Sequence, residues 1–195
     1  MVSEEGTQYD ASNMQVLEGW EAVRKRPGMY VGSTSERGLR HMVFEVADRA
    51  VNEVLDGRAA SVDVTLTPDG GVCVVDDGPG IPIDETGAAD GPGLEALLTK
   101  MQAGAGAAGG RHDVALGFCG VGPAVVNALS QRMTAEVRRE GVRWVQEYAR
   151  GLAATPLTEA GTATGSGATI AFWPTPTSSE PRRSRSTGWK SDLEN

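Results

Sequence analysis

Cysteine is scarce in this chain of 195 residues, and the two that occur, Cys73 and Cys119, are too few and wrongly spaced for a disulfide framework. No apolar run reaches the length of a membrane span, and no segment has the apolar centre of a secretory signal. We therefore expect a cytoplasmic protein without membrane contact.

Basic residues are outnumbered, with 18 Lys and Arg against 26 Asp and Glu, which gives a formal net charge of −8. Nonspecific affinity for DNA comes largely from phosphates neutralised by Lys and Arg, so we expect no direct DNA binding. No Gly-x-x-x-x-Gly-Lys-Ser/Thr segment occurs, and this excludes a P-loop nucleotide site. With 39% apolar residues, the chain can bury the core of one domain.

The chain divides into three parts by composition. Residues 1–13 are polar and are interpreted as a mobile arm, residues 14–174 carry periodic apolar patterns, and residues 175–195 form a disordered tail rich in Pro, Ser and Arg. Helical spacing predicts helices over 15–26, 39–56, 93–102 and 123–129. Alternation predicts strands over 61–66, 72–75, 134–139, 142–148 and 168–173, and glycines over 104–110 predict a lid loop. This order indicates a two-layer α+β sandwich.

Glu45, Arg49 and Glu53 are spaced four apart on the most strongly predicted helix and so project from one face. A solvated ladder of ion pairs is the plain interpretation, worth about 0.2–0.5 kcal/mol per pair. These three side chains would have a functional role only if their face of the helix lines a binding site in the folded chain.

Asp76 follows an apolar run and directly precedes the turn 77–80, which contains Pro79 and Gly80 and is followed by Ile81. Asp-Gly-Pro-Gly is ordinary turn chemistry, so a surface turn is one interpretation. The preceding strand and the following Ile81 favour a second interpretation, in which a ligand approaches the main chain here.

The glycines of 117–122 precede a predicted helix, and Gly117, Gly120 and Gly122 leave main-chain N–H groups accessible. Such groups at a helix N-terminus can hold a triphosphate without any particular side chain. The order is not the Gly-x-Gly-x-x-Gly of a dinucleotide-binding turn, and the β-α-β context of that turn is missing, so we discount it.

These three motifs, in this order, resemble the nucleotide pocket of the GHKL ATPases, in particular the amino-terminal ATPase domain of the DNA gyrase B family of type IIA topoisomerases. The agreement extends over residues 9–174 and is close at 24–30, 125–130 and 172–174. The resemblance implies a Bergerat fold, with helices on one mixed, largely antiparallel sheet. It also implies ATP as the ligand.

The resemblance implies a role for each matching position. Glu45 would activate the attacking water and Asp76 would accept a hydrogen bond from the adenine amino group. Tyr9, on the arm, would reach the nucleotide of a partner subunit in a dimer. The remaining implied ATP contacts are Gly80 and Ile81 at the base and Gly117, Gly120, Val121 and Gly122 at the phosphates. Pro79, Arg139 and Ala168 would lie at the pocket mouth, where aminocoumarin inhibitors bind in the family.

Several positions depart from the family pattern. Arg49 stands where the family has an asparagine that holds magnesium, and a guanidinium has donors only, so we assign no metal ligand. Arg49 would either contact phosphate directly or pair with Glu45 and Glu53. The family's lid lysine falls at Gly106, and a threonine near the adenine falls at Ala168. We expect ATP binding that depends little on magnesium, with weak or lost hydrolysis and no supercoiling by this chain alone.

Two other functions remain open at this point. A working ATPase of the topoisomerase type would retain turnover that depends on Glu45. A vestigial pocket would leave a noncatalytic partner or decoy of a gyrase subunit, held through the arm that carries Tyr9, or a homodimer formed through the same arm.

Overall fold

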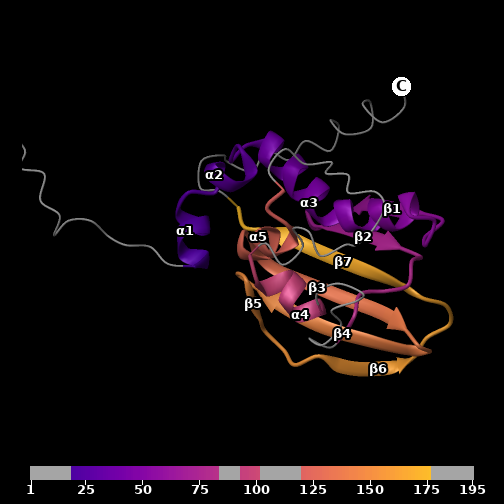
Figure 1. Cartoon of the computed structure of the whole chain (residues 1–195). Helices are drawn as coiled ribbons and strands as arrows, with labels where there is room; N and C mark the ends of the chain where they lie inside the picture. The colour runs from indigo at the N-terminus through magenta and orange to yellow at the C-terminus, as the bar shows by residue number, and fades with distance from the viewer. Residues whose placement is uncertain (1–18, 84–92, 102–119, 177–195) are drawn as a thin grey trace, which may run out of the picture.

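The computed structural model describes residues 19–83, 93–101 and 120–176. Short helices α1 and α2 precede the long helix α3, and the strands follow in two groups separated by α4 and α5 (Figure 1). The elements are α1 (Trp20–Lys25), α2 (Gly28–Val31), α3 (Glu36–Leu55), β1 (Val62–Leu66), β2 (Val72–Asp76), α4 (Leu94–Thr99), α5 (Pro123–Ala128), β3 (Ser130–Arg139), β4 (Val142–Ala149), β5 (Leu152–Ala153), β6 (Thr158–Thr162) and β7 (Gly167–Pro174).

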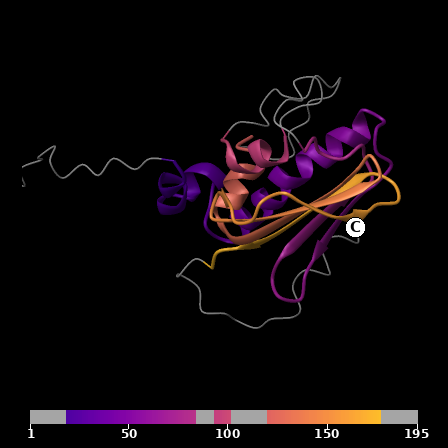
Figure 2. The same ribbon diagram turned by 90° about the horizontal axis from the view of Figure 1, so that it is seen from below.

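The strands form one sheet in the order β1-β2-β7-β3-β4-β5, with β6 also paired to β4. Every pairing among the described strands is antiparallel. The helices lie on one face of this curved sheet (Figure 2). Helix α3 contacts β1 and β2, while α5 contacts β3, β4 and β7. The expected two-layer α+β sandwich on a largely antiparallel sheet is confirmed.

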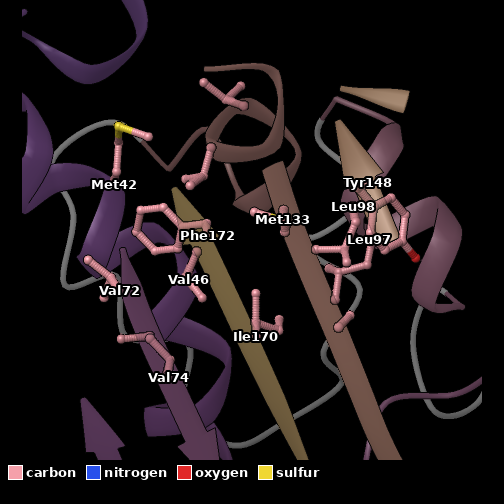
Figure 3. Packing of buried hydrophobic residues seen from close by; sticks show 14 of the residues in the cluster. Met42, Val46, Val72, Val74, Leu97, Leu98, Met133, Tyr148, Ile170 and Phe172 are labelled. Carbon is pink, nitrogen blue, oxygen red and sulfur yellow. The ribbon is translucent and has the colours of Figure 1, made fainter. Parts of the chain in front are cut away.

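Apolar side chains of the two layers meet in one core (Figure 3). Strand β2 alternates as a half-buried strand should, with Val72, Val74 and Asp76 toward the helices. Met42 and Val46 of α3 pack above them, and Phe172 of β7 is fully buried. Asp76 therefore sits at the end of an apolar row, on the inner side of the sheet.

The predicted helix over 39–56 is present but begins at Glu36, and the hairpin around 67–71 joins β1 to β2 as predicted. Leu39, at the start of the predicted range, is 42% exposed. Val64 and Leu66 are each 48% exposed, although they lie opposite the buried Val74 and Val72. Strand β1 lies at the edge of the sheet, so one of its flanks has no neighbouring strand to cover its side chains.

Strands β5 and β6 were not predicted, since one has two residues and the other is exposed along its length. The arm over 1–13, the lid over 104–110 and all of the tail beyond residue 176 lie outside the described residues. In the part that is described, no helix is both long and apolar enough to cross a membrane.

Candidate functional site

Glu45 lies on the inward face of α3 and is only 3% exposed. Its Oε2 accepts a hydrogen bond from the main-chain N–H of Gly122 at 2.8 Å. Its Oε1 is buried and has no hydrogen-bond partner among the described residues. A buried carboxylate oxygen without a donor is costly, so Oε1 of Glu45 is free to accept a hydrogen bond from a further group.

Gly122 caps the start of α5 with φ 78°, and Pro123 takes the first helical position. Gly120 also has a positive φ of 55°. A Cβ at either glycine would meet nothing within 4 Å among the described atoms, so the left-handed backbone rather than crowding selects glycine here. The turn brings the Gly122 N–H to Glu45, across a separation of 77 residues. Gly117 lies outside the described residues.

Asp76 ends β2, and its side chain is 2% exposed. Its Oδ1 accepts a hydrogen bond from the N–H of Gly78 at 3.1 Å. Its Oδ2 forms an ion pair with Nη2 of Arg49, which reaches down from α3. Asp76 is therefore a buried carboxylate neutralised by a guanidinium.

Arg49 has a second, longer ion pair, from Nη1 to Oε1 of Glu53 at 3.8 Å. Of the pairings expected for Arg49, the one with Glu53 is observed, and the one with Glu45 is not found among the described contacts. The main partner, Asp76, was missed by sequence reasoning, because the two residues are 27 positions apart and only the packing of α3 on β2 joins them. Glu53 also pairs with Arg58 at 2.6 Å.

The turn after Asp76 packs closely against the main chain of β3 and β7 at Gly80. Gly80 has φ 81°, and a Cβ there would lie 2.8 Å from the carbonyl oxygen of Arg138. The fold itself thus requires glycine at this position, whatever approaches from the other side. Ile81 is 2% exposed and belongs to the core.

The residues expected at the pocket mouth lie in different environments. Pro79 is exposed, and Arg139 is partly buried with its Nε 3.3 Å from Oε1 of Glu140. Ala168 is 1% exposed and pairs directly opposite Asp76 in the sheet, so it forms part of the wall behind that carboxylate. Val121, expected at the phosphates, is partly buried and packs against the core.

Arg138 supports the end of β2 from the other face of the sheet. Its Nη2 donates to the main-chain oxygen of Asp76 at 3.4 Å, and its Nη1 lies 3.8 Å from Oε1 of Glu136. In β3 the buried Met133, Ala135 and Val137 face the helices, so Arg138 and Glu136 lie on the opposite face. Arg138 therefore contacts the main chain of Asp76 and not its carboxylate.

The neighbouring carboxylate, Asp77, has a different task. Its Oδ1 accepts hydrogen bonds from the N–H groups of Ala60 and Ser61 at 2.8 and 2.9 Å. The Ser61 N–H and then the Ala60 N–H lower the pKa of Asp77 below its ordinary value of 3.8. Asp77 therefore stabilises the segment that leads into β1, whereas the side chain of Asp76 faces the helices.

Arg49 stands at the position where the resemblance expects an asparagine ligand of magnesium, and a guanidinium has donors only. The guanidinium of Arg49 extends from the position of the expected asparagine ligand into the space between α3 and β2, where it repels a cation.

Comparison with known proteins assigns this chain to a family. Residues 34–178 match the family model described as Histidine kinase-, DNA gyrase B-, and HSP90-like ATPase. The chain is 50% identical over 165 residues to the DNA gyrase B protein of Streptomyces coelicolor, covering 85% of this chain and 24% of that protein. It is 53% identical over 144 residues to the DNA gyrase B protein of Micrococcus luteus, covering 74% of this chain and 20% of that protein.

A third relative is the DNA gyrase B protein of Streptococcus pneumoniae, 45% identical over 168 residues, with 86% of this chain and 26% of that protein covered. The chain thus spans about a quarter of the length of the curated relatives it matches.

Proposed function

We propose a function from the family to which this chain belongs, the histidine kinase-, DNA gyrase B- and HSP90-like ATPases, in which it is an ATP-binding domain of the gyrase B type. The chain binds ATP with little dependence on magnesium and hydrolyses it weakly or not at all. One observation carries this proposal. Arg49 reaches Asp76 from the position where the family pattern has a metal ligand.

Binding of the base does not require the Arg49 to Asp76 pair to break. An ionised carboxylate has about four acceptor positions on its two oxygens. At Asp76 the Gly78 N–H uses one position and Arg49 uses another. Acceptor capacity remains for an adenine amino group, by the role that the resemblance gives Asp76.

Hydrolysis is affected more strongly than binding. The Oε1 of Glu45, which has no partner among the described residues, supports the expected role of this side chain, since a carboxylate within reach of a water can accept its proton in the transition state. Phosphoryl transfer depends chiefly on positioning and on cations that neutralise the phosphates. With Arg49 drawn to Asp76, neither a metal nor this guanidinium takes that position at the phosphates. A base is present, but its substrate is poorly held in line.

Calorimetric titration tests the proposal directly. ATP should bind the purified chain with affinity that changes by less than about threefold between EDTA and excess magnesium, a difference below about 0.7 kcal/mol. Absence of binding at millimolar ATP would overturn the proposal, and so would a strong metal requirement. Arg49→Asn should gain magnesium-dependent phosphate release, while Arg40→Asn, an exposed position on the same helix, serves as the control.

A second function is favoured by the same ion pair, because a carboxylate closed by a guanidinium is also what a vestigial pocket would contain. In that case the chain acts as a noncatalytic partner of a gyrase subunit or of a second copy of itself, through the arm that carries Tyr9. Co-purification with gyrase that is unaffected by Asp76→Asn would favour this function. Loss of the partner on deletion of residues 1–13 would locate the contact.

A further inference from the structure

The two edges of the sheet are built differently. At one edge β5 has only two residues, and the pairing of the exposed strand β6 with β4 has a register shift. Short strands and irregular pairing are among the features that keep a sheet edge from pairing with another chain. At the other edge β1 pairs with β2 through all five of its residues without a shift, and it contains neither proline nor lysine. The β1 edge therefore lacks this protection.

Strand β1 combines an open flank with exposed apolar side chains. Among the described strands it pairs only with β2, so the main-chain N–H and C=O groups of its other flank have no strand partner. Val64 and Leu66 lie on the face of the sheet that carries the helices, yet each is 48% exposed. Open backbone groups beside such side chains are what a strand from another chain binds.

Helix α3 presents an apolar side toward the same edge. Its Glu45 accepts from Gly122 at the start of α5, and α5 contacts β3 and β7 at the centre of the sheet. By helical spacing Val43, Val51 and Val54 lie on the side of α3 that is turned away from Glu45. Each of these valines is only partly buried. The apolar side of α3 thus lies next to the exposed row of β1.

The dimensions of the two layers suit a second copy of this chain at the β1 edge. Antiparallel pairing of β1 with its copy, about a twofold axis perpendicular to the sheet, would place the helices of both copies on the same face. Because α3 contacts both β1 and β2 (Figure 1), the two α3 helices would lie two strand spacings apart, or about 10 Å. Packed helices have axes about 8–10 Å apart. The α3 pair would therefore pack over the exposed row of β1.

The sequence of β1 is complementary to itself in the antiparallel direction. A twofold axis at Val64 pairs all five residues of the strand with those of the copy. Val64 then faces its own equivalent, and Val62 faces Leu66 of the second copy, so the apolar row continues across the joint. On the other face, Asp63 lies opposite Thr65 of the second copy. No two like charges oppose each other in this register.

We propose that two copies of this chain join through β1, forming one continuous antiparallel sheet with α3 packed against α3 of the second copy. The interface is isologous, since the same surface serves on both sides of the axis. It is separate from the nucleotide site and from the arm over 1–13. The dimer accordingly forms without ATP.

Sedimentation equilibrium of the full chain without nucleotide tests the proposal. The unmodified chain should form a dimer, and Val64→Lys should raise its dissociation constant about tenfold or more, because two lysines then face each other at the axis. The matched control is Thr65→Lys, which places its lysine opposite Asp63 of the second copy and should retain the dimer. A chain that stays monomeric at every concentration would overturn the proposal, and so would a Val64→Lys variant that dimerises as the parent does.

Amide hydrogen exchange gives a second measurement that needs no variant, in case Val64→Lys fails to fold. Exchange over 62–66 should slow as the concentration of the chain is raised, because the N–H groups on the open flank of β1 become bonded in the dimer. Exchange over 158–162, in β6 at the other edge, should not change. Exchange over 62–66 that is independent of concentration would overturn the proposal. Loss of the dimer on deletion of residues 1–13 would also overturn it, since the arm would then form the contact.

Discussion

Glu45 and Asp76 are carboxylates of the same site and are each 3% exposed, yet their hydrogen-bond partners differ. Glu45 accepts from one main-chain N–H and keeps one oxygen unpartnered among the described residues. Asp76 has both oxygens engaged, one by Gly78 and one by Arg49. Burial alone therefore does not say whether an acidic group is available for chemistry. The nature of its partners decides that.

The largest effect is expected at Glu45. In an Arg49→Asn background, where phosphate release is measurable, Glu45→Gln should reduce the rate by about 100- to 10,000-fold, because an amide cannot take the proton of the attacking water. Steady-state phosphate release measures the change. Glu36→Gln, at the exposed start of the same helix, should leave the rate unaltered. Equal rates of phosphate release in the Glu45→Gln variant and its parent would show that Glu45 is not the general base.

The next effect concerns stability at Asp76. Asp76→Asn leaves Arg49 partly buried with only the 3.8 Å contact to Glu53, which should cost about 3 kcal/mol of unfolding free energy. Urea denaturation followed by circular dichroism gives the value. Removing the exposed pair of Glu36 with Arg40 by Glu36→Gln should cost only about 0.3–0.5 kcal/mol. Similar losses in both variants would mean that the Asp76 pair is no stronger than a surface pair.

A buried network without an ion pair, in which Nε2 of Gln146 donates to Oε2 of Glu95 at 3.0 Å, sharpens the comparison. The hydroxyl of Tyr148 donates to Oε1 of Gln146 at 2.6 Å, and burial raises the pKa of Tyr148 well above its ordinary value. Tyr148→Phe should cost about 1–3 kcal/mol in urea denaturation, since the Gln146 oxygen is left without a donor. The matched control is Tyr30→Phe at a partly buried position. A loss of unfolding free energy in Tyr148→Phe as large as that in Asp76→Asn would contradict the expectation that breaking the ion pair costs more.

The smallest effect is expected at Asp77, an exposed carboxylate held only by hydrogen bonds. The Ser61 and Ala60 N–H groups lower the pKa of Asp77 below 3.8, so its ionised form stabilises the fold fully above that value. This stabilisation is lost as the pH falls through the folded pKa. The urea midpoint should therefore be lower in Asp77→Asn than in the parent at pH 7. The difference should disappear in acid below the folded pKa. A difference that persists there would show that the carboxylate charge is not involved.

Much of the fold could be predicted because it follows local periodicity. The spacing of Met42, Val46 and Ala50 gave α3, and alternation through Val72 and Val74 gave β2. The local pattern singled out the motifs that contain Glu45 and Asp76, and the resemblance to the gyrase B family supplied their expected roles. Periodicity did not show that Leu39, Val64 and Leu66 stay exposed, because it shows which residues share a face and not how far the opposite layer extends.

The sequence by itself determined the family, the main helices and strands, and the places of Glu45, Arg49 and Asp76 on them. Only the tertiary structure decided that Arg49 pairs with Asp76, that Arg138 donates to the main-chain oxygen of Asp76, and that Glu45 accepts from the Gly122 N–H. Each of these contacts joins residues at least 27 positions apart, on different elements. Local patterns carry no information about such distances, because the packing of one layer on the other sets them.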